Sequence, residues 1–251
     1  MELFKASRQW AQRPDDERFS SLKELHAVVS KYRSQAAEST VSYKSLGFTA
    51  SNDADVHLTS SKSGLSAKLT HWAFGQLCQR AGAPPSYLRG LPAPLASSCL
   101  NNGFKALQEG DETVQLMFHD QGGLLLRAAT TTRYTRIWNA DVTFRLLNLS
   151  SEWRVPPARP ARQGQAGVRK ATQNDVLHNK ETMGAPSINI GDLIAPAGLY
   201  ASDHDMFVFM VNEDRRIKDG TPEGLSRGFF CWNSEVGAAS FGLTAFLYRH
   251  V

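Results

Sequence analysis

Cations and flat rings alternate over a short stretch in the middle of the chain, a pattern suited to contact with nucleic acid. Its members are Arg127, Arg133, Tyr134, Arg136 and Trp138. Arginine neutralises phosphates, and an aromatic ring stacks on an unpaired base. On an extended backbone, Tyr134 and Arg136 would share one face, which places one ring beside one guanidinium. The stretch therefore predicts contact with a single strand. The alternative is ordinary surface arginines with a core Trp138.

A second basic stretch, residues 152–184, contains three prolines and three glycines. Its six Lys and Arg against three Asp and Glu supply +3 of the net +4 of the whole chain. Because large apolar residues are few, the composition predicts an exposed or mobile loop whose cations contact phosphates. The cations expected to do so are Arg154, Arg159, Arg162, Arg169 and Lys170.

Asp203, His204 and Asp205 place two carboxylates and an imidazole within three residues. If Glu235 and His250 converged on them, the group would suit Mg²⁺ or Mn²⁺ and a nuclease reaction. On a strand, however, Asp203 and Asp205 face one side and His204 the other, and the sequence is also typical of a turn. A metal site at Asp203, Asp205 and Glu235 is therefore the less favoured alternative, and no cofactor is expected.

Other polar or nucleophilic residues favour structural roles. Cys231 lies between two aromatic residues of an expected strand, where apolar surroundings raise the pKa of a thiol and make it unreactive. Asn233, Ser234 and Glu235 follow that strand and either bind a substrate or satisfy buried backbone groups. The sequence has no GxSxG, GxxxxGK[ST] or GxGxxG motif, which argues against a serine hydrolase, an ATPase or a dinucleotide enzyme.

The bulk composition is that of a chain with a substantial core. It has 251 residues, of which 41% are hydrophobic and 21% charged. The three cysteines share no CxxC spacing, which is typical of a reducing compartment. There is no apolar run of about 18 residues and no signal-peptide pattern, so a cytoplasmic protein with no membrane contact is expected.

Hydrophobic spacing predicts an α+β fold, a single domain over residues 1–251 with antiparallel sheets and helices packed on one side. Helices are expected over residues 16–34, 70–82 and 139–149, and a helical run over residues 87–100 is expected to be broken at Pro92 and Pro94. Strands are expected over residues 43–49, 56–58, 65–69, 113–118, 124–129, 206–211, 228–232 and 241–248. Thr70 is the expected N-cap of its helix.

Several blocks of the chain resemble the DUF932 family. They are SDHDMFVFMV and RGFFCWNSEVGAASFGLTAFLYRHV near the C-terminus, WAQRPDDERFSSL near the N-terminus, RAATTTRYTRIWNADV, and residues 69–91. The resemblance implies a protein encoded by a phage or plasmid. The biochemical role of that family is largely unassigned, so no catalytic residue carries over.

These patterns together predict a non-enzymatic nucleic-acid-binding protein of a mobile genetic element. Its expected task is binding or annealing single-stranded DNA, as in recombination, and a homo-oligomer is expected. Two alternatives remain open. One is a metal-dependent nuclease, and the other is a protein that inhibits a host defence system by binding it.

Overall fold

The computed structural model describes residues 12–51, 54–61, 64–107, 112–120, 122–165, 167–195, 198–221 and 224–249. Over these residues there are six α-helices and three sheets, with about 30% of the chain in helices and 35% in strands. All strand pairs there are antiparallel except the pair β5 and β7. The α+β prediction, with mostly antiparallel sheets, is confirmed.

The chain divides into two compact units. Unit 1 comprises the described parts of Met1–Lys31, Ile137–Glu235 and Ala239–Val251. Unit 2 comprises the described parts of Tyr32–Arg136 together with Val236–Ala238. Two compact units can still unfold as one domain, so the single-domain organisation stays a prediction.

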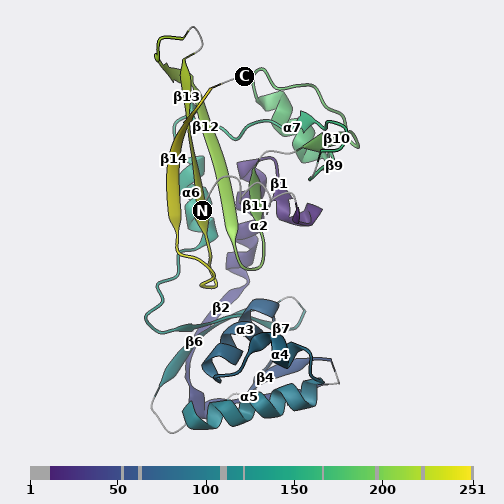
Figure 1. The fold of residues 1–251 in the computed structure, drawn as a ribbon, viewed down its shortest axis with the longest axis vertical. Helices are drawn as coiled ribbons and strands as arrows, with labels where there is room; N and C mark the ends of the chain where they lie inside the picture. Colours follow the sequence, from purple (N-terminus) through teal and green to yellow (C-terminus); the bar gives the residue numbers. More distant parts are fainter. Residues whose placement is uncertain are drawn as a thin grey trace. The chain divides into compact units, whose positions relative to one another are not determined.

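A five-stranded antiparallel sheet forms the body of unit 1 (Figure 1). In spatial order its strands are β1 (Arg18–Phe19), β11 (Leu199–Ala201), β12 (Met206–Ile217), β13 (Leu225–Asn233) and β14 (Gly242–Tyr248). The last three confirm the three C-terminal strands expected from the sequence. Helices α2 (Leu22–Ser34) and α6 (Asn139–Leu147) supply residues to the hydrophobic core on one face of this sheet.

The helix expected over residues 16–34 begins later than predicted. Asp15–Glu17 forms a 3₁₀ turn, η1, and Arg18–Phe19 pairs with β11 as strand β1. The α-helix therefore starts at Leu22, and its buried residues Leu25 and Val29 belong to the predicted apolar face.

The other face of the five-stranded sheet carries stacked aromatic rings. Tyr200, Phe207 and Phe230 are buried there, with ring centroids 5.5 and 5.6 Å apart along the row. Two glycines make the packing possible. A Cβ at Gly228 would lie 2.2 Å from the ring of Phe246, and a Cβ at Gly242 would lie 2.1 Å from the ring of Trp232. The same close approach explains why small residues interrupt these apolar strands.

The segment 152–184 corrects the sequence prediction, because over its described residues it is folded rather than a mobile loop. Its elements and the strand that follows are β8 (Arg159–Pro160), β9 (Arg169–Lys170), α7 (Gln173–Glu181) and β10 (Leu193–Ala195). The three strands form a sheet of order β8-β10-β9. Small residues suffice for its separate core, which is made by Ala158, Ala171, Val176, Ile188 and Ile194.

Unit 2 is a six-stranded sheet with helices α3 (His71–Arg80), α4 (Pro85–Arg89) and α5 (Ala93–Leu107). In spatial order the strands are β2 (Ala36–Ser42), β6 (Thr113–Asp120), β7 (Leu124–Thr131), β5 (Ser66–Leu69), β4 (Val56–Ser60) and β3 (Leu46–Ala50). Between β2 and β3 lies the 3₁₀ turn η2 (Tyr43–Ser45). Thr70 caps α3 as predicted, since its Oγ1 accepts a hydrogen bond from Ala73 N at 3.1 Å. The polar strand β2 was not predicted.

Candidate nucleic-acid interface

An open cavity of about 330 Å³ lies in unit 2, where β7 ends within the predicted binding stretch. The side chains and backbone that line it come from α3, from β7 and the loop after it, and from the short segment 236–238. They are Gln76, Gln79, Arg80, Ala129, Thr130, Thr131, Tyr134 and Gly237. One ring, two amides, two hydroxyls and one guanidinium thus share one cavity, which is the mixture of groups that recognises a base and its phosphate.

Gln76 fixes one wall of this cavity. Its Oε1 accepts a hydrogen bond from Ala129 N at 2.9 Å, and its Nε2 donates to Val236 O at 2.7 Å. Trp72 Nε1 donates to the same carbonyl at 3.1 Å. The segment 236–238 is therefore held against α3 by two side chains, and α3 is held against β7.

Gly237 keeps the cavity open. Its φ of +80° lies in the left-handed region that favours glycine. A Cβ placed there would lie 3.5 Å from Thr130 Cγ2, 3.6 Å from Gln76 Nε2 and 3.8 Å from Tyr134 Cε2. Any side chain at this position would consequently enter the space between the lining residues.

The loop after β7 places Tyr134 and Arg136 together, as the alternation of an extended backbone predicted. The Arg136 guanidinium carbon lies 5.5 Å from the centre of the Tyr134 ring, whereas Arg133 and Thr135 are exposed. Arg136, however, is not turned to solvent. Its Nε donates to Glu38 Oε1 at 2.6 Å, and its side chain is only 3% exposed. Arg136 therefore packs against the Tyr134 ring. The prediction that Arg136 contacts a phosphate is corrected, because its guanidinium is bound to Glu38.

The predicted phosphate contact of Arg127 is also corrected, because its side chain is buried inside unit 2. It is 4% exposed, and its Nη1 lies 3.1 Å from Nε2 of His119. Its guanidinium also lies 5.8 Å from the ring centre of Tyr32. Burial and the neighbouring Arg127 charge lower the pKa of His119 to about 4, so the imidazole is neutral near pH 7. Trp138, the remaining residue of the stretch, is half-buried and precedes α6 in unit 1.

The basic segment contributes fewer available cations than predicted. Arg154 forms ion pairs with Glu213 at 2.5 Å and Asp214 at 3.6 Å. Arg159, Arg162 and Lys170 are exposed. Arg159 and Arg162 line a broad concave surface that encloses a volume of about 990 Å³. The other lining residues are Pro156, Pro157, Pro160, Gln163, Gly164, Gln165, Gly184, Pro186 and Ala195.

Arg169 is buried and holds the segment in place. Its two terminal nitrogens each lie 2.7 Å from one oxygen of Asp175, and Ser20 Oγ bonds to the same carboxylate. Thr172 N donates to Asp175 at 2.6 Å and completes a capping box for α7. Burial alone would raise the pKa of Asp175, but the hydrogen bonds from Arg169, Ser20 and Thr172 lower it below its ordinary value. Arg169 is therefore a structural residue.

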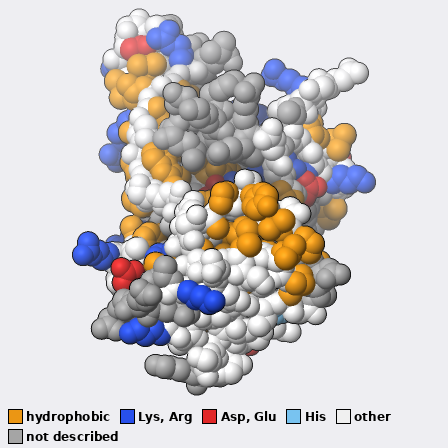
Figure 2. All heavy atoms as spheres, turned by 60° about the horizontal axis from the view of Figure 1, so that its bottom comes forward, with side chains coloured by type: hydrophobic (Ala, Val, Ile, Leu, Met, Phe, Trp, Pro, Cys, Tyr) orange, Lys and Arg blue, Asp and Glu red, His pale blue; other side chains and the backbone are white. Residues whose placement is uncertain are grey.

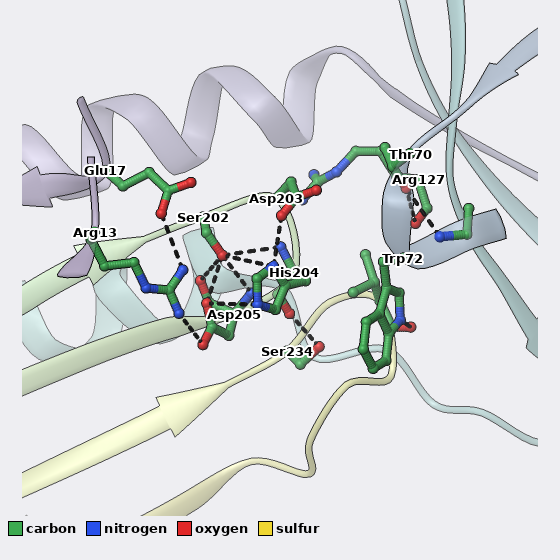
Figure 3. Close-up of polar contacts among 12 residues, drawn as sticks. Arg13, Glu17, Thr70, Trp72, Arg127, Ser202, Asp203, His204, Asp205 and Ser234 are labelled. Carbon is green, nitrogen blue, oxygen red and sulfur yellow. Dashed lines mark hydrogen bonds and ion pairs between the residues drawn. The ribbon is translucent and has the colours of Figure 1, made fainter. Parts of the chain in front are cut away.

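The Ser202–Asp205 turn is closed by its own hydrogen bonds (Figure 3). Ser202 Oγ and Asp203 Oδ1 both contact the same ring nitrogen, Nδ1 of His204, at 3.2 and 2.7 Å. The Ser202 hydroxyl also donates to Asp205 Oδ1 at 2.6 Å, so its hydrogen bonds stay within the turn. The bond with Asp203 raises the pKa of His204, and Arg13 pairs with Asp205 at 2.6 Å.

The metal alternative gains no support from the described residues. They contain no group of three or more His, Cys, Asp or Glu side chains placed to hold an ion. His250 lies outside them. Glu235 is 3% exposed, and its Oε1 accepts a hydrogen bond from Asn139 N at 2.8 Å, which caps the start of α6. Of the two roles left open for Glu235, the structure shows the structural one.

The three cysteines are free thiols. Cys231 is buried as predicted, and burial raises the pKa of its thiol to about 12. Its low reactivity stays a prediction. Over the described part of the chain, every helix is too short or too polar to cross a bilayer.

No family model, curated protein or solved structure matches this chain. The resemblance to the DUF932 family therefore stays a prediction.

Sequence reasoning singled out Tyr134 and Gly237, which line the cavity, but it missed Gln76 and Gln79. Gln76 and Gln79 lie one turn apart on α3, and the sequence offers no sign that β7 packs beside them. Gly237 and Gly242, with the small residues between them, suggest from sequence that a ligand or another backbone comes close, and Gly237 does line the cavity.

Proposed function

We propose that this protein binds single-stranded nucleic acid without cleaving it, and that Tyr134 stacks on a base. The observation that carries the proposal is the cavity beside the half-buried Tyr134 ring. Apart from Ala129 and Gly237, the residues that line this cavity have polar side chains. A stacked base contributes roughly 1–3 kcal/mol, and every base has a face to offer. Sequence-tolerant binding of a single strand follows from such a ring.

Polar groups around the ring supply the remaining contacts. The Gln79 amide and the Thr131 hydroxyl can hydrogen-bond to base edges. Two cations are adjacent to these groups. Arg80 lines the cavity, and its Nη1 also donates to the Tyr43 hydroxyl. Arg133 is exposed and directly precedes Tyr134. Figure 2 shows lysines and arginines scattered singly over the face it presents.

The wider setting of the proposal rests on the sequence. The resemblance to the DUF932 family supports a role in a mobile genetic element, such as annealing single-stranded DNA. Three free cysteines suit a reducing compartment, and we propose the cytoplasm.

A titration of a fluorescently labelled oligothymidylate by anisotropy tests the proposal. Tyr134→Ala should weaken binding by roughly 5- to 150-fold, the equivalent of one lost stack, whereas Tyr134→Phe should retain most of the affinity. Tyr87→Ala is the matched control, because this tyrosine is also in unit 2 but is 65% exposed on α4.

Wild-type protein that does not bind the strand would overturn the proposal, as would folded Tyr134→Ala with unchanged affinity. Melting temperatures of all three variants show whether each is folded. Repeating the titration with Mg²⁺ and inspecting the oligonucleotide on a gel detects cleavage, which would favour the nuclease.

A further inference from the structure

Strand β14 ends the five-stranded sheet of unit 1 and presents an unusually apolar edge. It forms seven consecutive pairs with β13 and shows no register shift. Within the described residues, no strand pairs with its outer side. The regular ladder thus leaves a row of outward backbone N–H and C=O groups, which is a template for another extended strand.

The side chains of β14 do nothing to discourage such pairing. The strand reads Gly-Leu-Thr-Ala-Phe-Leu-Tyr, with no charged residue and no proline. Leu243 is 55% exposed and Leu247 is 54% exposed. Soluble proteins commonly protect an edge strand with lysine, proline or a bulge, and β14 has none of these.

We infer that β14 pairs with β14 of a second copy of this chain, antiparallel and across a two-fold axis at Ala245. The two leucines stand two residues on either side of Ala245, so each Leu243 would face Leu247 of the other copy. Ala245 would face itself, and no like charges would oppose each other. The strand is thus complementary to its own copy, and it needs no partner of different sequence.

The arrangement also closes after two copies. At the opposite end of the sheet, β1 contains only two residues and offers little ladder to extend. A two-fold interface uses the same patch on both copies, so no equivalent edge is left for a third. The result is a dimer with a continuous sheet through both copies, and it does not depend on the proposed nucleic-acid binding.

Sedimentation equilibrium over a concentration series tests the dimer. Wild-type protein should dimerise, and Leu243→Lys with Leu247→Lys should weaken the dimer roughly tenfold or more, because lysines would then face each other. Leu243→Lys with Leu247→Glu places opposite charges in register and should restore part of the affinity. Leu95→Lys, on an equally exposed leucine of α5, is the control.

Cysteine cross-linking tests the register independently of those variants. In a Cys99→Ser background, which removes the exposed thiol, Ala245→Cys should form a disulfide-linked dimer under mild oxidation. Thr244→Cys should cross-link much less, since its partner across the axis would be Phe246. A monomeric wild-type protein, a dimer unaffected by the two lysines, or equal cross-linking at both positions would each overturn the inference.

Discussion

Residues 127–138 and residues 152–184 are the two stretches in which cations suggested contact with nucleic acid, and the structure treats them differently. In the first, the cation beside the ring is bound to Glu38, yet Tyr134 still lines an open cavity. In the second, Arg169 is enclosed with Asp175, whereas the exposed Arg159 and Arg162 accompany prolines around a broad concave surface. The difference lies in where a carboxylate is available to each guanidinium.

The role of an arginine is therefore ambiguous from sequence until its acidic partner is known. Glu38 is 98 residues from Arg136, so no local pattern reveals that pair. Asp175 is only six residues from Arg169, but Ser20, which also hydrogen-bonds to Arg169, is 149 residues away. Four predictions test the distinction between enclosed and available cations.

The largest effect is expected from Asp175→Ala. Removing one partner of a buried, bidentate ion pair leaves Arg169 uncompensated, which costs about 3–5 kcal/mol of unfolding free energy. Urea denaturation followed by circular dichroism measures the loss. Asp214→Ala is the matched control, because its side chain is 48% exposed and its ion pair is long. Equal midpoints for the two variants would show that the network does not stabilise the segment.

The pH dependence of the unfolding free energy should report the burial of Arg127, because desolvation by burial and the buried Arg127 charge both lower the pKa of its neighbour His119. The pKa of His119 is about 4 in the folded protein, below that of an unfolded histidine, so only the unfolded chain takes up the proton between these values. The contribution of neutral His119 to the unfolding free energy should be fully present above pH 6.5. It should be lost, by at most about 3 kcal/mol, as the pH drops towards 4. His119→Gln should flatten the decline between pH 6.5 and 5, where carboxylates contribute less. A wild-type decline that persists in His119→Gln would assign it to other groups.

Arg136→Ala should affect stability more than binding. The variant loses a charge-assisted hydrogen bond to Glu38, and because that glutamate is partly exposed the cost should be about 1–2 kcal/mol. Oligonucleotide affinity should fall less than in Tyr134→Ala. If affinity fell as far as in Tyr134→Ala while the melting temperature stayed constant, Arg136 would be a direct phosphate contact after all.

The smallest effect is expected from the exposed cations of the basic segment. Replacing Arg159, Arg162 and Lys170 with serine should lower the slope of log affinity against log salt by about 0.7 for each phosphate that is no longer neutralised. Lys105→Ser, at an exposed position of α5, shows what the loss of one positive charge elsewhere does to the slope. An unchanged slope would confine binding to the Tyr134 cavity.

Much of the fold follows from local pattern. The C-terminal strands, the hairpin of β6 and β7 and the capped helix α3 were predicted because their apolar spacing and turn residues are adjacent in sequence. Helix α7 was missed although Thr172 and Asp175 have the spacing of a capping box, since its small core gives little apolar signal. Strand β2 was missed because most of its side chains are exposed.

The cavity was less predictable than the fold. Tyr134 has a recognisable setting, whereas the hydrogen bond from Gln76 to Val236 O, which fixes one wall, joins residues 160 positions apart. Contacts over such distances depend on how sheets and helices assemble, and hydrophobic periodicity does not encode them.

The pairing of β1 with β11 has a consequence for synthesis on the ribosome. Phe19 pairs with Leu199, so the first strand of this sheet is made 180 residues before its neighbour. At 5–20 residues per second, translation needs roughly 10 to 40 seconds to cover that interval. During it the apolar side of α2 has none of the strands it packs against in the finished sheet, while β2 to β7 of unit 2 have already been made. The order of translation therefore favours assembly of the six-stranded sheet of unit 2 before the five-stranded sheet that contains β1.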